Sequence, residues 1–201
     1  MPYSEFTLKK VKNEFDLQII ENKTIFNNIN AVDIDSDFKN KLEENIHLAL
    51  AINTEKARSE FIIAYVLSEI KYQLKDRISL FSGVDFDVDK EKNLNGFCDF
   101  IISLSSEQFY ITAPVITVVE AKNENIVAGI GQCLSEMVAS QQFNDREHNS
   151  LGKIYGAITT GNAWKFMKLE NKCVYIDRKE YHIENIEKIM GILLAMIDQL
   201  A

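Results

Sequence analysis

The segment Val115–Val119 is the feature that most constrains how this 201-residue chain can fold. All five of its residues are β-branched, a composition that disfavours a helix and is typical of a strand. Because no charged residue interrupts the segment, both faces of the strand should be buried. A strand buried on both faces lies inside a sheet that helices cover on each side. The segment therefore predicts an α/β protein.

The hydrophobic periodicity before and after this strand predicts the order of the other elements. The expected strands are 80–88, 97–104, 115–119, 154–160, 163–169 and 174–176. The expected helices are 38–50, 55–75, 126–141 and 184–200. Asn53-Thr54 either caps the second of these helices or bends one long helix. The resulting architecture is a central mixed β-sheet flanked by helices.

No linker, low-complexity tract or internal repeat divides the chain, so a single domain over 1–201 is expected. An N-terminal helical region would occupy 1–54, the core 55–170, and a C-terminal strand and helix 171–201. The C-terminal helix carries an apolar stripe of Ile186, Met190, Leu193, Ile197 and Leu200. That stripe either packs on the chain's own sheet or forms the interface of a homodimer.

The charge balance excludes one broad class of function. The chain carries 22 Lys and Arg against 30 Asp and Glu, which is a net charge of −8. Sequence-independent coating of nucleic acid requires a basic surface, so that role is excluded, although a local basic groove is not. The chain also lacks an apolar run of about 18 residues and an N-terminal signal segment, so a cytoplasmic protein with no membrane partner is expected.

Charged residues stand at the end of the central strand, where burial is expensive unless they are paired or bind a metal. Glu120 and Lys122 are two residues apart, so they project to the same side of the strand. Asp99 interrupts the preceding apolar strand and would converge with Glu120 if the two strands are neighbours. Two carboxylates suit Mg²⁺, which also takes water and phosphate oxygens. Lys122 would lie beside that ion.

This pattern, Asp99 followed by Glu120-Ala121-Lys122, resembles the PD-(D/E)xK nuclease superfamily. The resemblance covers roughly Glu55 to Leu169. It implies a restriction-endonuclease-like core with the element order αβββαβ, here with N-terminal and C-terminal helical additions. Glu55 to Glu60 also looks like the corresponding segment of uncharacterised bacterial proteins assigned to this superfamily.

The resemblance implies a role for each matching residue. Asp99, Glu120 and the carbonyl of Ala121 would hold Mg²⁺, for which Mn²⁺ is a possible substitute. Glu60, on the helix face of Ala64 and Leu67, would bind the metal directly or through water. Lys122 would position the attacking water.

Gln132, on the helix after the strand, would orient the substrate or Lys122. Two positions depart from the family pattern. Cys98 rather than a proline precedes Asp99, and Glu136 stands where the related exonuclease branch has a tyrosine four residues after its glutamine.

Three interpretations follow. The first is a Mg²⁺-dependent nuclease that hydrolyses phosphodiester bonds, with DNA as its expected partner. The second is a catalytically silent protein of the same fold that acts as a binding or assembly module. The third is an α/β protein in which these charges are only structural. The complete set of Asp99, Glu120 and Lys122 favours the first.

Overall fold

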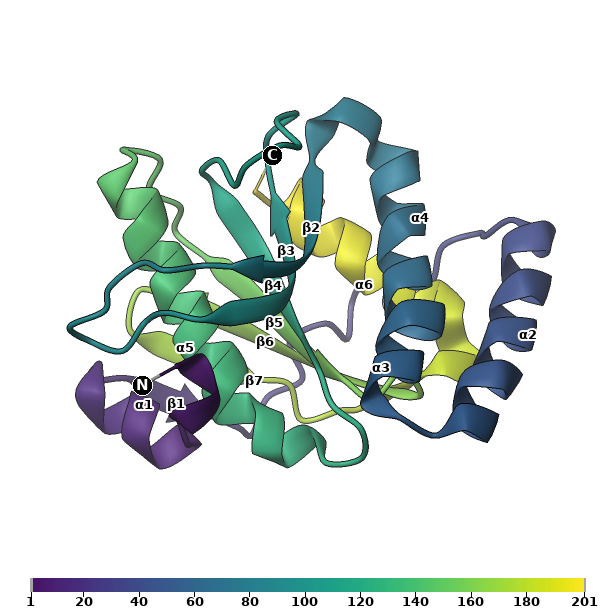
Figure 1. Ribbon diagram of the computed structural model, residues 1–201, viewed down its shortest axis with the longest axis horizontal. Helices are drawn as coiled ribbons and strands as arrows, with labels where there is room; N and C mark the ends of the chain where they lie inside the picture. Colours follow the sequence, from purple (N-terminus) through teal and green to yellow (C-terminus); the bar gives the residue numbers. More distant parts are fainter. Residues whose placement is uncertain (1, 201) are drawn as a thin grey trace.

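A mixed sheet runs through the middle of the protein, which we describe over residues 2–200 from a computed structural model (Figure 1). Within those residues it has eight strands. They are β1 (Gln18–Ile20), β2 (Ser79–Asp85), β3 (Phe97–Ser103), β4 (Val115–Ala121), β5 (Ile154–Thr159), β6 (Ala163–Glu170), β7 (Cys173–Ile176) and β8 (Tyr181–His182). The α-helices are α1 (Leu8–Glu14), α2 (Ser36–Ile52), α3 (Glu55–Arg58), α4 (Ala64–Leu74), α5 (Ile126–Arg146) and α6 (Ile186–Asp198).

The strand order is β1-β7-β6-β5-β4-β3-β2. The short strand β8 lies outside this order and pairs with β6. β4 therefore lies inside the sheet, where it is antiparallel to β3 and parallel to β5. All seven residues of β4 are buried. The prediction of a central strand buried on both faces is confirmed, and with it the α/β class.

Helices cover both faces of the sheet (Figure 1). One apolar core joins the sheet to α2, α4 and α6, and a second joins it to α1 and α5. The two layers explain why β4 is apolar without alternation, since each face meets a helical layer. No helix within residues 2–200 is long and apolar enough to cross a membrane.

Most predicted elements are confirmed, and several details differ. The strand predicted over 80–88 ends at Asp85, because the chain turns into a loop closed by an isolated bridge between Asp89 and Leu94. The N-terminal region expected to be helical is helical only over Tyr3–Glu5, Leu8–Glu14 and Ser36–Ile52, and it also contains β1, a strand that the periodicity did not indicate. Asn53 and Thr54 separate two helices: Asn53 ends α2 in a left-handed conformation, and Thr54 caps α3.

The apolar stripe of α6 is part of the protein core. Ile186, Met190, Leu193 and Ile197 are buried among residues of the sheet and of α4. The stripe thus packs against the chain's own sheet and α4. A homodimer through the C-terminal helix stays a prediction.

The N-terminal segment crosses α5 at Gly131, where the two backbones approach each other closely. A Cβ atom at Gly131 would lie 2.3 Å from the carbonyl oxygen of Phe6 and 2.5 Å from the carbonyl carbon of Thr7. We expect Gly131→Ala to destabilise the protein by about 1–3 kcal/mol, the usual cost of overpacking, despite the higher helix propensity of alanine. Urea unfolding measures this change.

Gly152→Ala is the matched control, because no atom lies within 4 Å of a Cβ at that position. It should leave the free energy of unfolding unchanged within about 0.5 kcal/mol. Equal stability of the two variants would show that the N-terminal segment is not held against α5.

Candidate active site

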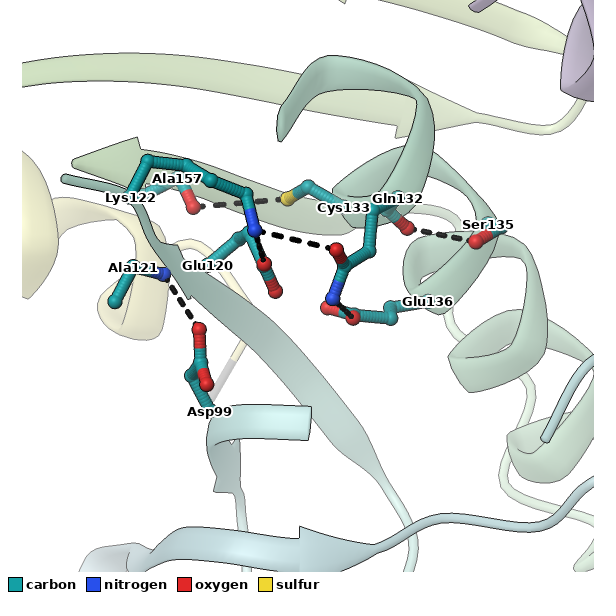
Figure 2. A network of polar contacts seen from close by, with 9 residues as sticks. All are labelled: Asp99, Glu120, Ala121, Lys122, Gln132, Cys133, Ser135, Glu136 and Ala157. Atoms are coloured by element: carbon teal, nitrogen blue, oxygen red, sulfur yellow. Dashed lines mark hydrogen bonds and ion pairs between the residues drawn. The ribbon is translucent and has the colours of Figure 1, made fainter. Parts of the chain in front are cut away.

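The register between β3 and β4 brings two carboxylates together. Phe100 pairs with Val119, so the next step along the two strands sets Asp99 beside Glu120. Asp99 Oδ2 accepts a hydrogen bond from the backbone N–H of Ala121 at 2.8 Å (Figure 2). The Asp99 side chain therefore satisfies a backbone donor at the end of β4, and it lies close enough to Glu120 for its negative charge to raise the pKa of that group.

A chain of polar contacts runs from β4 to α5 (Figure 2). Lys122 Nζ forms an ion pair with Glu120 Oε1 and donates to Gln132 Oε1 at 3.3 Å. Gln132 Nε2 in turn donates to Glu136 Oε1 at 3.1 Å. The amide of Gln132 thus bridges the lysine and a third carboxyl group, because it accepts at one end and donates at the other.

Close packing fixes the position of Lys122. Its backbone N–H donates to the carbonyl of Thr159 at 2.8 Å, which continues the pairing of β4 with β5. Its side chain passes Gly129 of α5, where a Cβ would lie 3.2 Å from Lys122 Cγ and 2.8 Å from Ile158 Cγ2. Gly129 therefore gives α5 the close approach to the sheet that lets Gln132 reach the lysine.

Most side chains of the site are buried or partly buried. The side chain of Glu120 is 1% exposed and that of Lys122 is 22% exposed, and Glu136 is fully buried. The Oε2 atoms of Glu120 and Glu136 are both buried and receive no hydrogen bond from the described residues. A buried carboxylate oxygen without a donor is costly, so these atoms need a cation or a proton.

The pKa values of the site reflect this burial. Burial, followed by the negative charge of Asp99, raises the pKa of Glu120 to about 7, although Lys122 opposes the change. Burial likewise raises the pKa of Asp99. The pKa of Glu136 lies well above its ordinary value because the group is buried and faces Glu120. Burial disfavours the charged form of Lys122, but Glu120 and the other nearby carboxylates outweigh this effect and raise its pKa.

The structure does not bring Glu60 to this cluster. Glu60 pairs with Lys56 at 2.9 Å and its side chain is 53% exposed. It lies in a π-helical turn, Ser59–Ile63, between α3 and α4. The extra residue of a π turn rotates the helix by about 100° relative to a regular α-helix, which changes the face on which Glu60 lies. Glu55 is the carboxylate of this helix whose charge raises the pKa of Asp99 and of Lys122.

Two residues of the site were not predicted to have a role. Glu136 was noted only as a departure from a family pattern, although its spacing of four from Gln132 places both on one helix face. Glu55 carries no comparable signal, because an acidic residue in the first turn of a helix is ordinary. Its relation to Asp99 depends on how α3 packs against the sheet.

The donors of the site fit a hard divalent cation. No group of three or more His, Cys, Asp and Glu side chains among residues 2–200 is arranged to hold a metal ion. Mg²⁺ does not require such a group, because one or two carboxylates suffice when water and phosphate oxygens complete its shell. Asp99 and Glu120 offer two carboxylates, and no residue in the described range 2–200 donates a hydrogen bond to Glu120 Oε2.

The carboxylates and the ammonium group of this arrangement can stabilise charges of opposite sign. Asp99, Glu120 and Lys122 lie close together at the end of β4, and Gln132 contacts the lysine from α5. No protein-family model matches this chain, and neither does any curated protein.

Proposed function

We propose that the protein is a Mg²⁺-dependent nuclease of the PD-(D/E)xK type, with a restriction-endonuclease-like fold, that hydrolyses phosphodiester bonds of DNA. One observation carries this proposal. Asp99 and Glu120 converge at the end of the central strand, and Lys122 lies in contact with Glu120. The order of α4, three strands, α5 and β5 agrees with the expected core.

Each residue then has a defined task. Asp99, Glu120 and the carbonyl of Ala121 would hold Mg²⁺, which when bound lowers the pKa of a water ligand and offsets phosphate charge. Lys122 would hold the attacking water by a hydrogen bond and offset the charge that develops on the phosphate. Gln132 keeps the ammonium group of Lys122 directed into the site through its 3.3 Å contact. The burial of Glu120 limits the access of bulk water to these charges, which strengthens their interactions.

Incubation of the purified protein with plasmid and single-stranded DNA, in Mg²⁺, Mn²⁺ or chelator, tests the proposal. Cleavage that requires the divalent ion is expected. Absence of cleavage of either substrate with both ions would contradict the nuclease and leave a binding or assembly module as the alternative. Cleavage that persists in chelator would contradict the metal-dependent mechanism.

Mg²⁺ should also stabilise the folded protein, because the unfolded chain lacks the paired carboxylates. At a concentration of about 100 times the dissociation constant, the gain is about 2.7 kcal/mol. For a chain of this length that corresponds to a rise of about 5–10 °C in the melting temperature. Thermal unfolding with and without Mg²⁺ measures the effect.

Asp99→Asn should abolish this rise, whereas Glu60→Gln should leave it unchanged, because Glu60 pairs with Lys56 outside the cluster. A reduced rise in Glu60→Gln would instead support Glu60 as a metal ligand. An equal rise in Asp99→Asn and the wild type would place the bound Mg²⁺ elsewhere.

A further inference from the structure

Glu136 lies where a carboxyl group is expensive to place. It is fully buried on α5, and its neighbours on that helix, from Cys133 to Ser140, are buried as well. Burial, followed by the negative charge of Glu136, raises the pKa of the Cys98 thiol on β3 and of the Cys133 thiol on α5. The carboxyl group therefore lies close to the apolar core between α5 and the sheet, to which both cysteines belong.

The stability of the fold gives no reason for an acid at this position. Glu136 Oε2 is buried and receives no hydrogen bond from residues 2–200. A buried carboxyl oxygen without a donor costs free energy, and an apolar side chain of similar size avoids that cost. The other oxygen, Oε1, accepts a hydrogen bond from Gln132 Nε2 at 3.1 Å. Through this contact the acid can act on the candidate site.

The hydrogen bond from Gln132 to Glu136 favours one orientation of the glutamine amide. An amide accepts through its oxygen and donates through its nitrogen, so its two ends are not interchangeable. With Nε2 directed to Glu136, Oε1 lies 3.3 Å from Lys122 Nζ and accepts from it (Figure 2). The reverse orientation would set the N–H donors of the amide against an ammonium group, which has no acceptor. Glu136 thus favours the orientation in which Gln132 binds the lysine.

The contact with Gln132 determines how the ammonium group of Lys122 is held. An ammonium group has three N–H donors. Within the described part of the chain two acceptors engage them, Glu120 Oε1 and Gln132 Oε1. A single acceptor would let the group swing on its flexible stem, whereas two acceptors fix the direction of the third N–H. That third donor is left for a water molecule or a phosphate oxygen.

We propose that Glu136 is a positioning residue for Lys122: it holds the amide of Gln132 and so fixes the direction of the N–H that is left for the attacking water. This inference rests on the proposed nuclease function and concerns how that site is organised. Glu136 acts through Gln132 and touches neither the substrate nor the metal in this role. Because the two residues are four apart on α5, their side chains share one face of the helix and can meet.

Cleavage kinetics in Mg²⁺ test this role with matched variants. Glu136→Met removes the acceptor with little change of volume and should lower kcat about tenfold, with KM within about twofold of the wild type. The double variant Gln132→Met/Glu136→Met should lose no more activity than Gln132→Met alone, because the two residues act as a unit. Glu136→Gln, whose amide oxygen can still accept from Gln132 Nε2, should keep kcat within about threefold of the wild type. Additive losses, or equal losses in Glu136→Gln and Glu136→Met, would overturn the inference.

Two controls separate positioning from a structural or metal-binding role. Ser140→Ala changes a buried residue one turn beyond Glu136, whose hydroxyl group donates to a backbone carbonyl, and should leave kcat within about twofold of the wild type. Glu136→Met should unfold in urea no more readily than the wild type, since methionine buries no carboxyl group. It should also keep the rise in melting temperature that Mg²⁺ produces. Loss of that rise would make Glu136 a metal ligand and overturn the inference.

NMR of the Lys122 ammonium group separates this inference from the proposed function. Its proton–nitrogen signal, identified by its absence in Lys122→Met, is observed when hydrogen bonds slow the exchange of its protons with water. The signal should be present in the wild type and in Glu136→Gln and broadened in Glu136→Met. Equal signals in all three, or none in the wild type, would overturn the role of Glu136, whether or not DNA is cleaved. The expected signals without cleavage in Mg²⁺ or Mn²⁺ would refute the nuclease and leave Glu136 as a positioning residue of Lys122.

Discussion

Lys122→Ala and Asp99→Ala are each expected to reduce Mg²⁺-dependent cleavage by roughly 10²- to 10³-fold, the usual cost of removing one group that stabilises a charged transition state. Asp99→Ala removes one of two carboxylates that can hold the metal. It also removes the acceptor of the 2.8 Å hydrogen bond that the backbone N–H of Ala121 donates to Asp99. Lys122→Ala removes the ammonium group that contacts Glu120 and Gln132. Initial rates at saturating Mg²⁺ measure both effects.

Lys56→Ala is the matched control for the lysine substitution. Lys56 is an exposed lysine on α3 that pairs with Glu60, so its loss should leave the cleavage rate within about twofold of the wild type. Cleavage that survives in both Lys122→Ala and Asp99→Ala would remove the proposed mechanism. Cleavage that survives in only one would assign the essential role to the other.

Folding must be checked in the same variants. Lys122→Ala leaves the carboxylate of Glu120 buried without its ion-pair partner, and a broken buried pair is destabilising by about 3–5 kcal/mol. Circular dichroism at the assay temperature shows whether the variant is folded. Lys122→Met, which retains much of the side-chain volume without the charge, provides a second variant with fewer packing changes.

The sequence was sufficient to predict the centre of the fold and the core of the site. A β-branched segment with no charge until its end has few alternatives to a buried strand, and β4 is such a strand. Glu120 and Lys122 are two residues apart on a strand, so the sequence predicts that they lie on the same side. Their ion pair agrees with this prediction. The convergence of Asp99 with Glu120 required only that β3 and β4 be neighbours, which the register confirms.

The parts that were not predicted depend on packing between elements distant in sequence. A regular 3.6-residue period placed Glu60 beside Ala64 and Leu67, but the π-helical turn breaks that period. Single-residue changes in helical phase leave no mark in the hydrophobic pattern, because nearly all faces of this helix are apolar. β1 was not predicted because none of its three residues is buried and because it pairs with β7, far along the chain.

The buried carboxyl groups should make the apo protein less stable as the pH rises. The pKa of Glu120 is about 7 in the folded protein against an ordinary value of 4.5. The folded state therefore binds more protons than the unfolded state between these values. The stabilising contribution is fully present below pH 4.5 and is lost as the pH rises through 7, a decrease of about 3 kcal/mol in the free energy of unfolding.

Urea unfolding in chelator from pH 4.5 to 8 tests this expectation. Because the negative charge of Glu120 helps to raise the pKa of Glu136, either Glu120→Gln or Glu136→Gln should flatten the curve. Glu147→Gln, at the exposed end of α5, should retain the full slope and so controls for the repulsion that a net charge of −8 produces at higher pH. Mg²⁺ should reverse the trend, since it binds the deprotonated carboxylates and replaces the proton as their partner. Identical slopes in the wild type, Glu120→Gln and Glu136→Gln would mean that these acids are already charged and compensated in the folded protein, which would remove the reason for a cation at this site.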